Sequence, residues 1–139
     1  MKKLKLLLPL LALASFAFIS CSDDDDDATT ALQRLQNKWS VDSLVFKTTT
    51  GGTVSTTTKY TGSTDDYYDF RTDNKLYYDV HSTPPLKDTV SYQLIGNSTL
   101  VTDGSDTSSI SVLTSSKLLT YTKTGNATDY LEVFGYFRR

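Results

Sequence analysis

The chain has little of what most enzymes, metal proteins and disulfide-stabilised domains depend on. Its 139 residues include one cysteine, Cys21, and one histidine, His81. A single cysteine excludes an intramolecular disulfide, and a zinc site needs several ligands. The sequence contains no G-x-S-x-G nucleophile elbow and no phosphate-loop, dinucleotide-binding or zinc motif. We therefore expect a protein that is not an enzyme and that has no cofactor and no metal.

Net charge is also lacking over most of the chain. The whole sequence has 14 basic and 16 acidic residues. Three of the basic residues are Lys2, Lys3 and Lys5, and residues 23–27 are five aspartates, so 11 residues of each sign remain from Ala28 onward. A neutral domain lacks the positive surface that nucleic acid requires. We expect no nucleic-acid partner.

Long apolar segments are lacking except at the start of the chain. Residues 1–20 carry three lysines followed by an apolar run at 6–19, which is short for a membrane-spanning helix and predicts a secretion signal. Residues 18–21, Phe-Ile-Ser-Cys, resemble a lipobox, in which the cysteine accepts diacylglycerol on its sulfur and becomes the new N-terminus. We expect Cys21 to be lipidated and to anchor the protein to a membrane. The alternative is ordinary cleavage before Cys21, which would leave a free thiol.

An acidic tether, residues 21–28, follows the predicted signal. After the cysteine it contains Ser22, Asp23, Asp24, Asp25, Asp26 and Asp27. It resembles the surface-export signal of some Gram-negative lipoproteins, which implies an outer-membrane protein displayed at the cell surface. The alternatives are a solvated spacer, a weak Ca²⁺ site, since carboxylates suit that ion, and an inner-membrane retention signal. Ser22 directly after the cysteine argues against retention.

Residues 29–139 are predicted to form one all-β domain. Residues 28–37 have the apolar spacing of a short helix, with Thr29 or Thr30 as its cap. Eight or nine short alternating segments follow, separated by turn residues: 39–46, 54–60, 67–70, 76–80, 90–94, 99–102, 110–112, 118–123 and 130–137. Because no second helical segment is present, we expect an antiparallel meander. Closure into a barrel would remove its edges, and a two-sheet sandwich is the alternative.

Three segments carry a family resemblance. Residues 35–41 match an L-x-G-x-W pattern with Asn37 in place of glycine, residues 68–76 match F-x-x-D-G-x-L with Asn74 in place of glycine, and residues 110–114 match I-x-x-L-T. In this order they resemble the lipocalin-like domains of secreted bacterial lipoproteins. The resemblance implies a lipocalin-like barrel of eight or nine strands, preceded by one short helix. It also implies that Trp39 covers one end of the barrel against final-strand residues such as Phe134 or Tyr136.

His81 and the aspartates are the candidate reactive residues. A Ser–His–Asp triad is one interpretation of His81, but a histidine in the loop before Ser82 is better explained as plain surface. Aspartates gather in two groups that include potential Ca²⁺ ligands, and neither group has EF-hand spacing. Turn formation explains them better. These aspartates are Asp65, Asp66, Asp69, Asp73, Asp79, Asp103 and Asp106.

Tyrosine is abundant and is the most suggestive residue type. Its rigid amphipathic side chain suits sugars, lipids or protein partners, whereas core packing and cross-strand pairing explain most positions more simply. Alternation places Tyr67 and Tyr77 on one face of a hairpin and Tyr68 and Tyr78 on the other. Residues 42–44 and 88–90, Asp-Ser-Leu and Asp-Thr-Val, also resemble O-glycosylation sites of surface lipoproteins. The other tyrosines are Tyr60, Tyr92, Tyr121, Tyr130 and Tyr136.

These features predict a membrane-anchored, surface-displayed lipoprotein whose non-enzymatic barrel binds a small apolar or amphipathic ligand. The alternative is a structural or interaction module of a cell-envelope protein complex, with a filled barrel and no ligand. A hydrolase is a third, less favoured class. A cavity of roughly 300 Å³ or more would separate the first two classes. The sequence does not indicate which residues bind the ligand.

Overall fold

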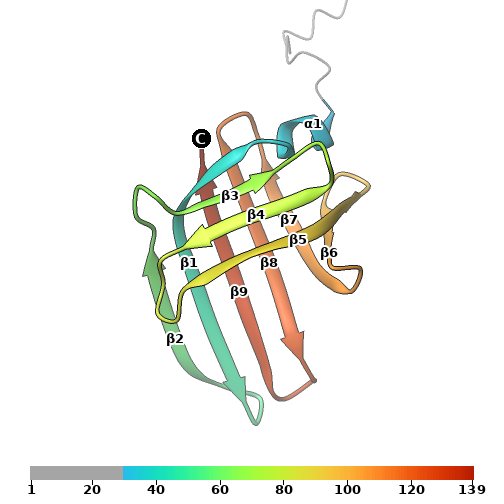
Figure 1. Ribbon diagram of the computed structural model, residues 1–139. Helices are drawn as coiled ribbons and strands as arrows, with labels where there is room; N and C mark the ends of the chain where they lie inside the picture. Colours follow the sequence, from blue (N-terminus) through green and yellow to red (C-terminus); the bar gives the residue numbers. More distant parts are fainter. Residues whose placement is uncertain (1–29) are drawn as a thin grey trace, which may run out of the picture.

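The computed structural model describes residues 30–139 (Figure 1). The predicted signal at 1–20, the lipidation site Cys21 and the tether at 21–28 lie outside the described residues. Among those described, no helix has both the length and the apolar character needed to cross a membrane.

One short helix is followed by nine strands, which confirms the predicted all-β class. The strands match the predicted segments, and most are longer by a few residues. In chain order the elements are α1 (Ala31–Leu35), β1 (Lys38–Thr50), β2 (Thr53–Thr61), β3 (Tyr67–Phe70), β4 (Lys75–Val80), β5 (Leu86–Ile95), β6 (Thr99–Thr102), β7 (Asp106–Leu113), β8 (Lys117–Gly125) and β9 (Tyr130–Arg138).

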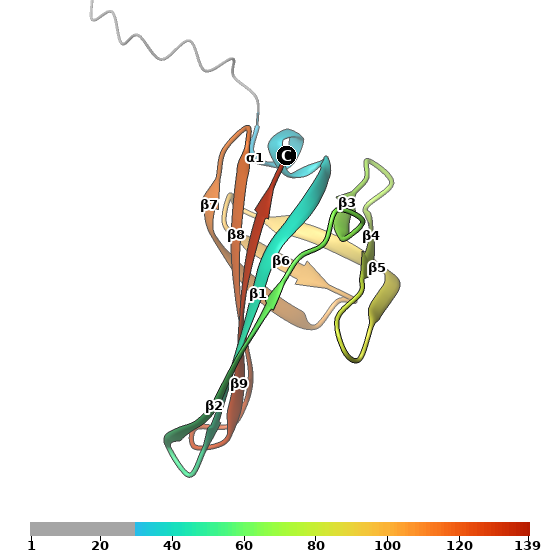
Figure 2. The ribbon, with the colours of Figure 1, turned by 90° about the vertical axis from the view of Figure 1, so that its left-hand side faces the viewer.

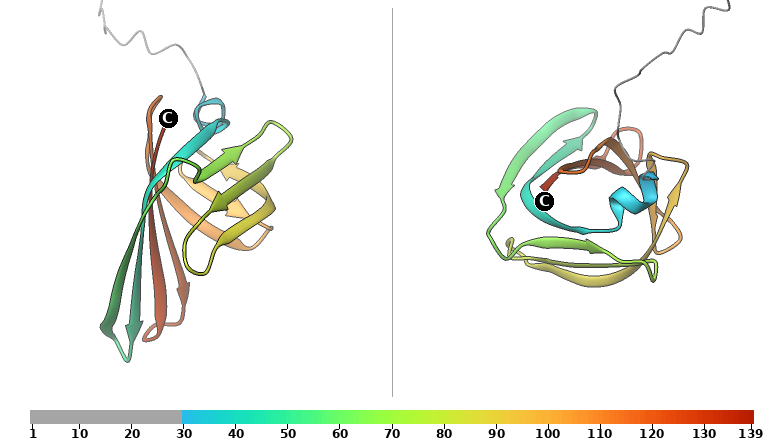
Figure 3. Two further views of the ribbon diagram at one scale, coloured as in Figure 1. Left: turned by 60° about the vertical axis from the view of Figure 1, so that its left-hand side comes forward. Right: turned by 90° about the horizontal axis from the view of Figure 1, so that it is seen from above.

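Helix α1 is fixed at both ends by side chains. The hydroxyl of Thr30 accepts a bond from the backbone N–H of Gln33 (3.2 Å), and the Gln33 side chain accepts one from the backbone N–H of Thr30 (2.8 Å). This capping box satisfies N–H groups that the helix itself leaves unpaired. The Asn37 amide donates to two carbonyls of the last turn. The helix ends earlier than predicted because β1 begins at Lys38. Helix α1 lies over one end of the barrel (Figure 3).

Eight strands close into an antiparallel barrel, as predicted, and the sandwich alternative is wrong. Strands β1 and β3 to β9 form a closed ring, because β1 pairs with both β3 and β9. Strand β2 is an additional strand. It pairs with β1 from residue 43 onward, whereas β3 pairs only with β1 residues 38–40. One edge of β1 thus serves two partners in succession, and the barrel wall is split where β2 and β3 diverge.

The long strands continue beyond the short ones. Figure 2 shows β2, β1, β9 and β8 extending away from the hairpins formed by β3 to β6. We call this four-stranded part, in the order β2-β1-β9-β8, the extended sheet. Its inner face continues the barrel wall with the row Thr58, Phe46, Val133 and Thr122, and the row Lys59, Val45, Phe134 and Tyr121 lies on its outer face. Strand β2 is exposed along most of its length, as expected of a strand at the solvent-exposed edge of a sheet.

The apolar core includes the helix and the strand residues nearest to it. Leu35 of α1 and Trp39 of β1 are both fully buried, and the Trp39 indole N–H donates to the Leu35 carbonyl at 3.0 Å. The strands contribute Val41, Leu44, Phe70, Leu76, Val80, Tyr92, Leu100, Ile110, Leu118 and Phe137. This packing closes the helix end of the barrel.

Trp39 is buried as predicted, but its predicted partners are wrong. Phe134 and Tyr136 lie on the outer face, where Phe134 packs on Tyr121 with ring centroids 5.0 Å apart and Tyr136 is 38% exposed. Phe137 is the final-strand aromatic that joins the core with Trp39. The guanidinium of Arg139 lies 4.8 Å from the Trp39 ring. Side chains along β9 alternate between the two faces, and the prediction placed Phe134 and Tyr136 on the inner face, which Phe137 occupies instead.

Candidate ligand-binding cavity

The barrel interior is not filled. A cavity of about 340 Å³ lies between β1, β3 to β9 and the inner face of the extended sheet. One side of its lining is apolar and belongs to the core or packs directly on it. This apolar side consists of Leu44, Phe70, Leu76, Val90, Leu100 and Phe137. The volume is within the range of small-molecule sites.

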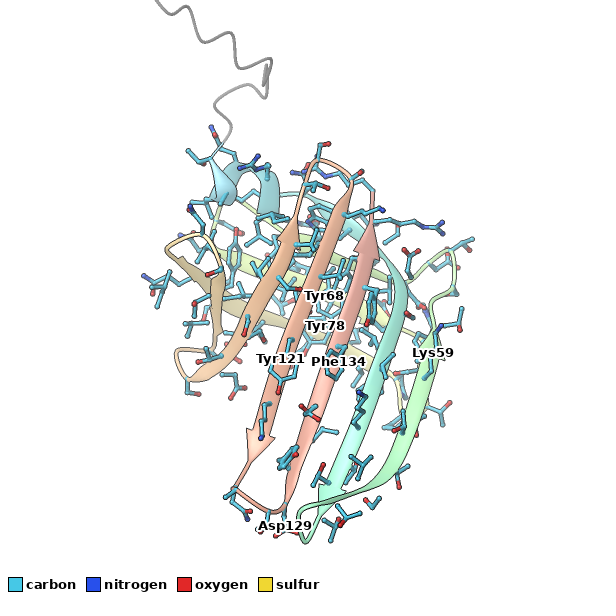
Figure 4. The ribbon with its side chains drawn as sticks, turned by 180° about the vertical axis from the view of Figure 1, so that it is seen from behind. Lys59, Tyr68, Tyr78, Tyr121, Asp129 and Phe134 are labelled. Atoms are coloured by element: carbon cyan, nitrogen blue, oxygen red, sulfur yellow. The ribbon has the colours of Figure 1, made fainter. Side chains whose placement is uncertain are left out.

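Two tyrosines form one wall of the cavity. Tyr68 on β3 and Tyr78 on β4 face each other across the strands and stack with centroids 5.2 Å apart and an interplanar angle of 17°. Tyr68 also meets Phe137 edge to face at 4.9 Å. Figure 4 shows the two tyrosines behind β8 and β9, inside the barrel. The predicted alternation is confirmed, because Tyr67 and Tyr77 instead contact Lys38 and Arg71 on the other face.

The tyrosine hydroxyls have no protein partner within residues 30–139. Burial raises the pKa of Tyr68 to about 12, with the neighbouring Tyr78 adding to the shift. Burial also raises the pKa of Tyr78, and the charges of Asp88 and Asp103 add to this. Neither hydroxyl takes part in a hydrogen bond with these residues, whereas those of Tyr60, Tyr92 and Tyr121 all do. Two protonated phenols are therefore available to a molecule in the cavity.

The side of the cavity opposite the tyrosines is lined with hydroxyl groups. Alternation in β8 turns Thr120, Thr122 and Thr124 inward, and the hydroxyls of Ser108 and Thr122 lie 2.6 Å apart. Gly135 lies beside Thr120, and a Cβ at that position would meet the Thr120 hydroxyl at 2.6 Å. The glycine thus keeps this part of the barrel open.

Three carboxylates complete the lining. Asp88 on β5, Asp103 in the turn between β6 and β7, and Asp106 on β7 are all exposed residues at the cavity. Asp103 accepts bonds from the backbone N–H and the hydroxyl of Ser91, and Asp88 accepts one from the N–H of Thr89. Among the described residues, no lysine, arginine or histidine lines the cavity.

A second hollow, the side groove, lies where the barrel wall is split. It has a volume of about 520 Å³ and is bounded by β1 and β2 on one side and by the loop between β4 and β5 on the other. Phe46, Tyr60, Leu86 and Pro84 supply most of its apolar surface, and Lys59 is the basic residue in its lining.

His81 is paired with a buried aspartate. Asp66 is 1% exposed, and its carboxylate accepts bonds from the Ser63 N–H (2.7 Å), the Tyr60 hydroxyl (2.5 Å) and the His81 N–H (2.9 Å). The ring Nδ1 of His81 lies 2.8 Å from the same carboxylate. Burial alone would raise the pKa of Asp66, but these hydrogen bonds hold it far below its ordinary value. The hydrogen bond to Asp66 is the main reason that the pKa of His81 is raised.

This pair connects two loops and does not form the triad considered from the sequence. The Tyr60 hydroxyl bonds to Asp66, and no serine hydroxyl among the described residues bonds to the His81 ring. The nearby Ser82 hydroxyl instead donates to the Pro84 carbonyl at 2.7 Å. Three further aspartates of this group hold turns or ion pairs: Asp73 accepts from the Lys75 N–H, Asp69 pairs with Arg71, and Asp79 pairs with Lys87. Among residues 30–139 no three metal-ligating side chains converge on one point.

No protein-family model, curated protein or solved structure matches the chain. The barrel is shown by the structure, and membership of a lipocalin-like family stays a prediction.

The acidic part of the cavity was not predicted from the sequence. In the sequence, Asp88 stands out only within an O-glycosylation-like triplet, and Asp103 and Asp106 only as turn residues. The alternation of β5 and β7 carried a signal, since Asp88 shares a face with Val90 and Tyr92, and Asp106 with Ser108 and Ile110. Charged residues in phase with core residues indicate the open end of a barrel.

Proposed function

We propose that this protein is a membrane-anchored lipoprotein, displayed at the outer-membrane surface, whose lipocalin-like barrel binds a small apolar or amphipathic ligand without catalysing a reaction. Cys21 carries the lipid, and residues 22–27 direct export. We expect external protease to reach residues 30–139 on intact cells. The observation that carries the binding proposal is the open cavity of about 340 Å³ with its apolar side.

The cavity favours a ligand over a filled structural barrel. In a filled barrel, side chains from all strands meet on the axis. Here they meet only toward the helix end, where Trp39 and Leu35 are fully buried. At the other end Thr122 and Val133 remain partly exposed on the cavity wall. A buried apolar surface beside partly exposed hydroxyls suits a molecule with one apolar and one polar end.

Binding is testable with a neutral apolar dye, N-phenyl-1-naphthylamine, and the full chain carrying Cys21→Ser. We expect a saturable rise in dye fluorescence at one site per chain. Val90→Trp should weaken binding by about tenfold or more, because the indole would occupy part of the cavity. Val54→Trp is the matched control, since Val54 is 56% exposed and lies outside the cavity. Equal dye affinity of both variants and the parent chain would contradict binding in the cavity.

The anchor is tested by Cys21→Ser. The serine hydroxyl cannot take the place of the sulfur that accepts diacylglycerol, so the variant should incorporate no isotope-labelled fatty acid in growing cells. The parent chain should incorporate it. The substitution lies outside residues 30–139, so the variant should keep the circular dichroism spectrum of the parent. Equal labelling of the Cys21→Ser variant and the parent would overturn the lipid anchor.

A further inference from the structure

The carboxylates of the cavity lack counter-charges from residues 30–139. Within this part of the chain the acidic groups in salt bridges are Asp42, Asp66, Asp69 and Asp79. Asp88, Asp103 and Asp106 are absent from these pairs, although the domain from Ala28 onward has as many basic as acidic residues. Three like charges around one opening create a negative potential there. That potential favours an entering cation and disfavours an entering anion.

A continuous path leads from these carboxylates to the apolar side of the cavity. Asp88 is the cross-strand partner of Tyr78, Tyr78 stacks on Tyr68 at 5.2 Å, and Tyr68 meets Phe137 at 4.9 Å. The path thus runs from a carboxylate, past two tyrosine rings, to the apolar ring of Phe137. Aromatic ring faces also attract cations, so the middle of the path accepts either part of a cationic ligand.

The hydroxyls of Tyr68 and Tyr78, which lack partners within residues 30–139, are a second, independent observation. Both side chains are only partly buried, so a polar group of a ligand that displaces water from these hydroxyls can take over the water's hydrogen bonds. Both tyrosines belong to the cavity lining (Figure 4). A ligand that passes from the carboxylates to Phe137 would lie along both rings, with its polar end nearest Tyr78, the cross-strand partner of Asp88.

We propose that the ligand is an amphipathic organic cation, whose ammonium group lies among Asp88, Asp103 and Asp106 and whose apolar part lies against Tyr68 and Phe137. This inference rests on the proposed function, because it names the chemical class that the same cavity takes. A fatty acid or another amphipathic anion would place its charge beside three uncompensated carboxylates. A bare metal ion would leave the apolar side unused, and no three ligating groups in residues 30–139 converge on one ion.

Three ligands of equal chain length test the inference: decylammonium, decanol and decanoate. Each is titrated by calorimetry into the full chain carrying Cys21→Ser, the two ions below their micelle concentrations and decanol below its solubility limit. We expect decylammonium to bind about tenfold more tightly than decanol, since exposed ion pairs contribute modestly and several act together. Decanoate should bind more weakly than decanol. The preference for decylammonium should shrink from about 0.02 M to about 0.5 M salt, because screening lengths fall over this range.

The variants locate the effect. Asp88→Asn with Asp106→Asn should abolish most of the preference for decylammonium over decanol. Asp42→Asn with Asp65→Asn removes the same net charge from exposed residues outside the cavity, and it should leave the preference intact. Circular dichroism of both double variants should match that of the parent chain.

The outcomes separate the two proposals. Binding of decanol and decanoate as tight as that of decylammonium would overturn the cation inference and leave the cavity as an apolar site. An equal fall of the preference for decylammonium in both double variants would also overturn the cation inference. The net charge of the domain, and not the carboxylates of the cavity, would then cause the preference. No binding of any of the three ligands would overturn the proposed function itself.

Discussion

Trp39→Ala should remove about 3–5 kcal/mol from the domain's free energy of unfolding, a large part of its total stability. The side chain is fully buried, its indole N–H donates to Leu35, and the Arg139 guanidinium lies over its ring. Truncating a buried aromatic costs about 3–5 kcal/mol, and a small domain has roughly 5–15 kcal/mol in total. The substitution also removes the indole bond to Leu35, which is one of the contacts that hold α1 on the barrel. Urea unfolding followed by circular dichroism measures the loss.

Trp39→Phe is the matched control. It retains most of the buried ring and removes the hydrogen bond, so its free energy of unfolding should lie between those of the parent and Trp39→Ala. The parent chain should show blue-shifted tryptophan emission that iodide quenches poorly, because Trp39 is the only tryptophan. A Trp39→Ala domain within about 1 kcal/mol of the parent would contradict the closed, packed helix end.

Asp66→Asn should produce the second large loss, of about 2–3 kcal/mol. The carboxylate is buried and accepts from Ser63, Tyr60 and His81. An asparagine of the same shape must turn an NH₂ group toward one set of these donors, which leaves buried N–H groups without an acceptor. The loops before β3 and after β4 should then loosen, because Asp66 joins them. Faster amide exchange at Ser63 and His81 would report this directly.

The same pair predicts how stability depends on pH. The pKa of Asp66 is lowered on folding, so its contribution is present above the ordinary value of 3.8 and is lost as the pH falls from there toward the folded-state pKa. The pKa of His81 is raised, so its contribution is complete below 6.5 and is lost as the pH rises through its folded-state value. The parent should be most stable between these limits. Asp66→Asn should flatten both sides of the profile, and an unchanged profile would show that the pair does not couple to folding.

The fold was largely predictable because its signals are local. Strand alternation and turn residues lie within a few positions of each other, and Gly51, Gly52 and Asn74 adopt the positive φ angles that their turns require (59°, 77° and 60°). Asn37, which stands in place of glycine in the L-x-G-x-W pattern, binds carbonyls of α1 through its side chain. The two successive partners of β1 were not predictable, since the choice between β2 and β3 depends on how the whole barrel closes.

The candidate site was less predictable because it combines residues that are distant in the sequence. Tyr68 and Tyr78 are neighbours in one hairpin, and their shared face followed from alternation. The presence of Asp88 and Asp106 in the lining of one cavity depends on two further hairpins and on the twist of the barrel. The pair of buried Asp66 and exposed His81 spans 15 positions and has no periodic signal. A cavity volume depends on every side chain around it, so no local pattern predicts it.

Native mass spectrometry of the Cys21→Ser chain, purified from cells without detergent, tests most directly whether the barrel holds a small molecule. We expect a species heavier than the chain by one small organic molecule. That molecule should be released on denaturation and be absent from Val90→Trp, where the indole occupies the cavity. A parent chain that shows only its own mass, and that also takes up no added decanol or decylammonium, would contradict the claim and leave a barrel without a ligand.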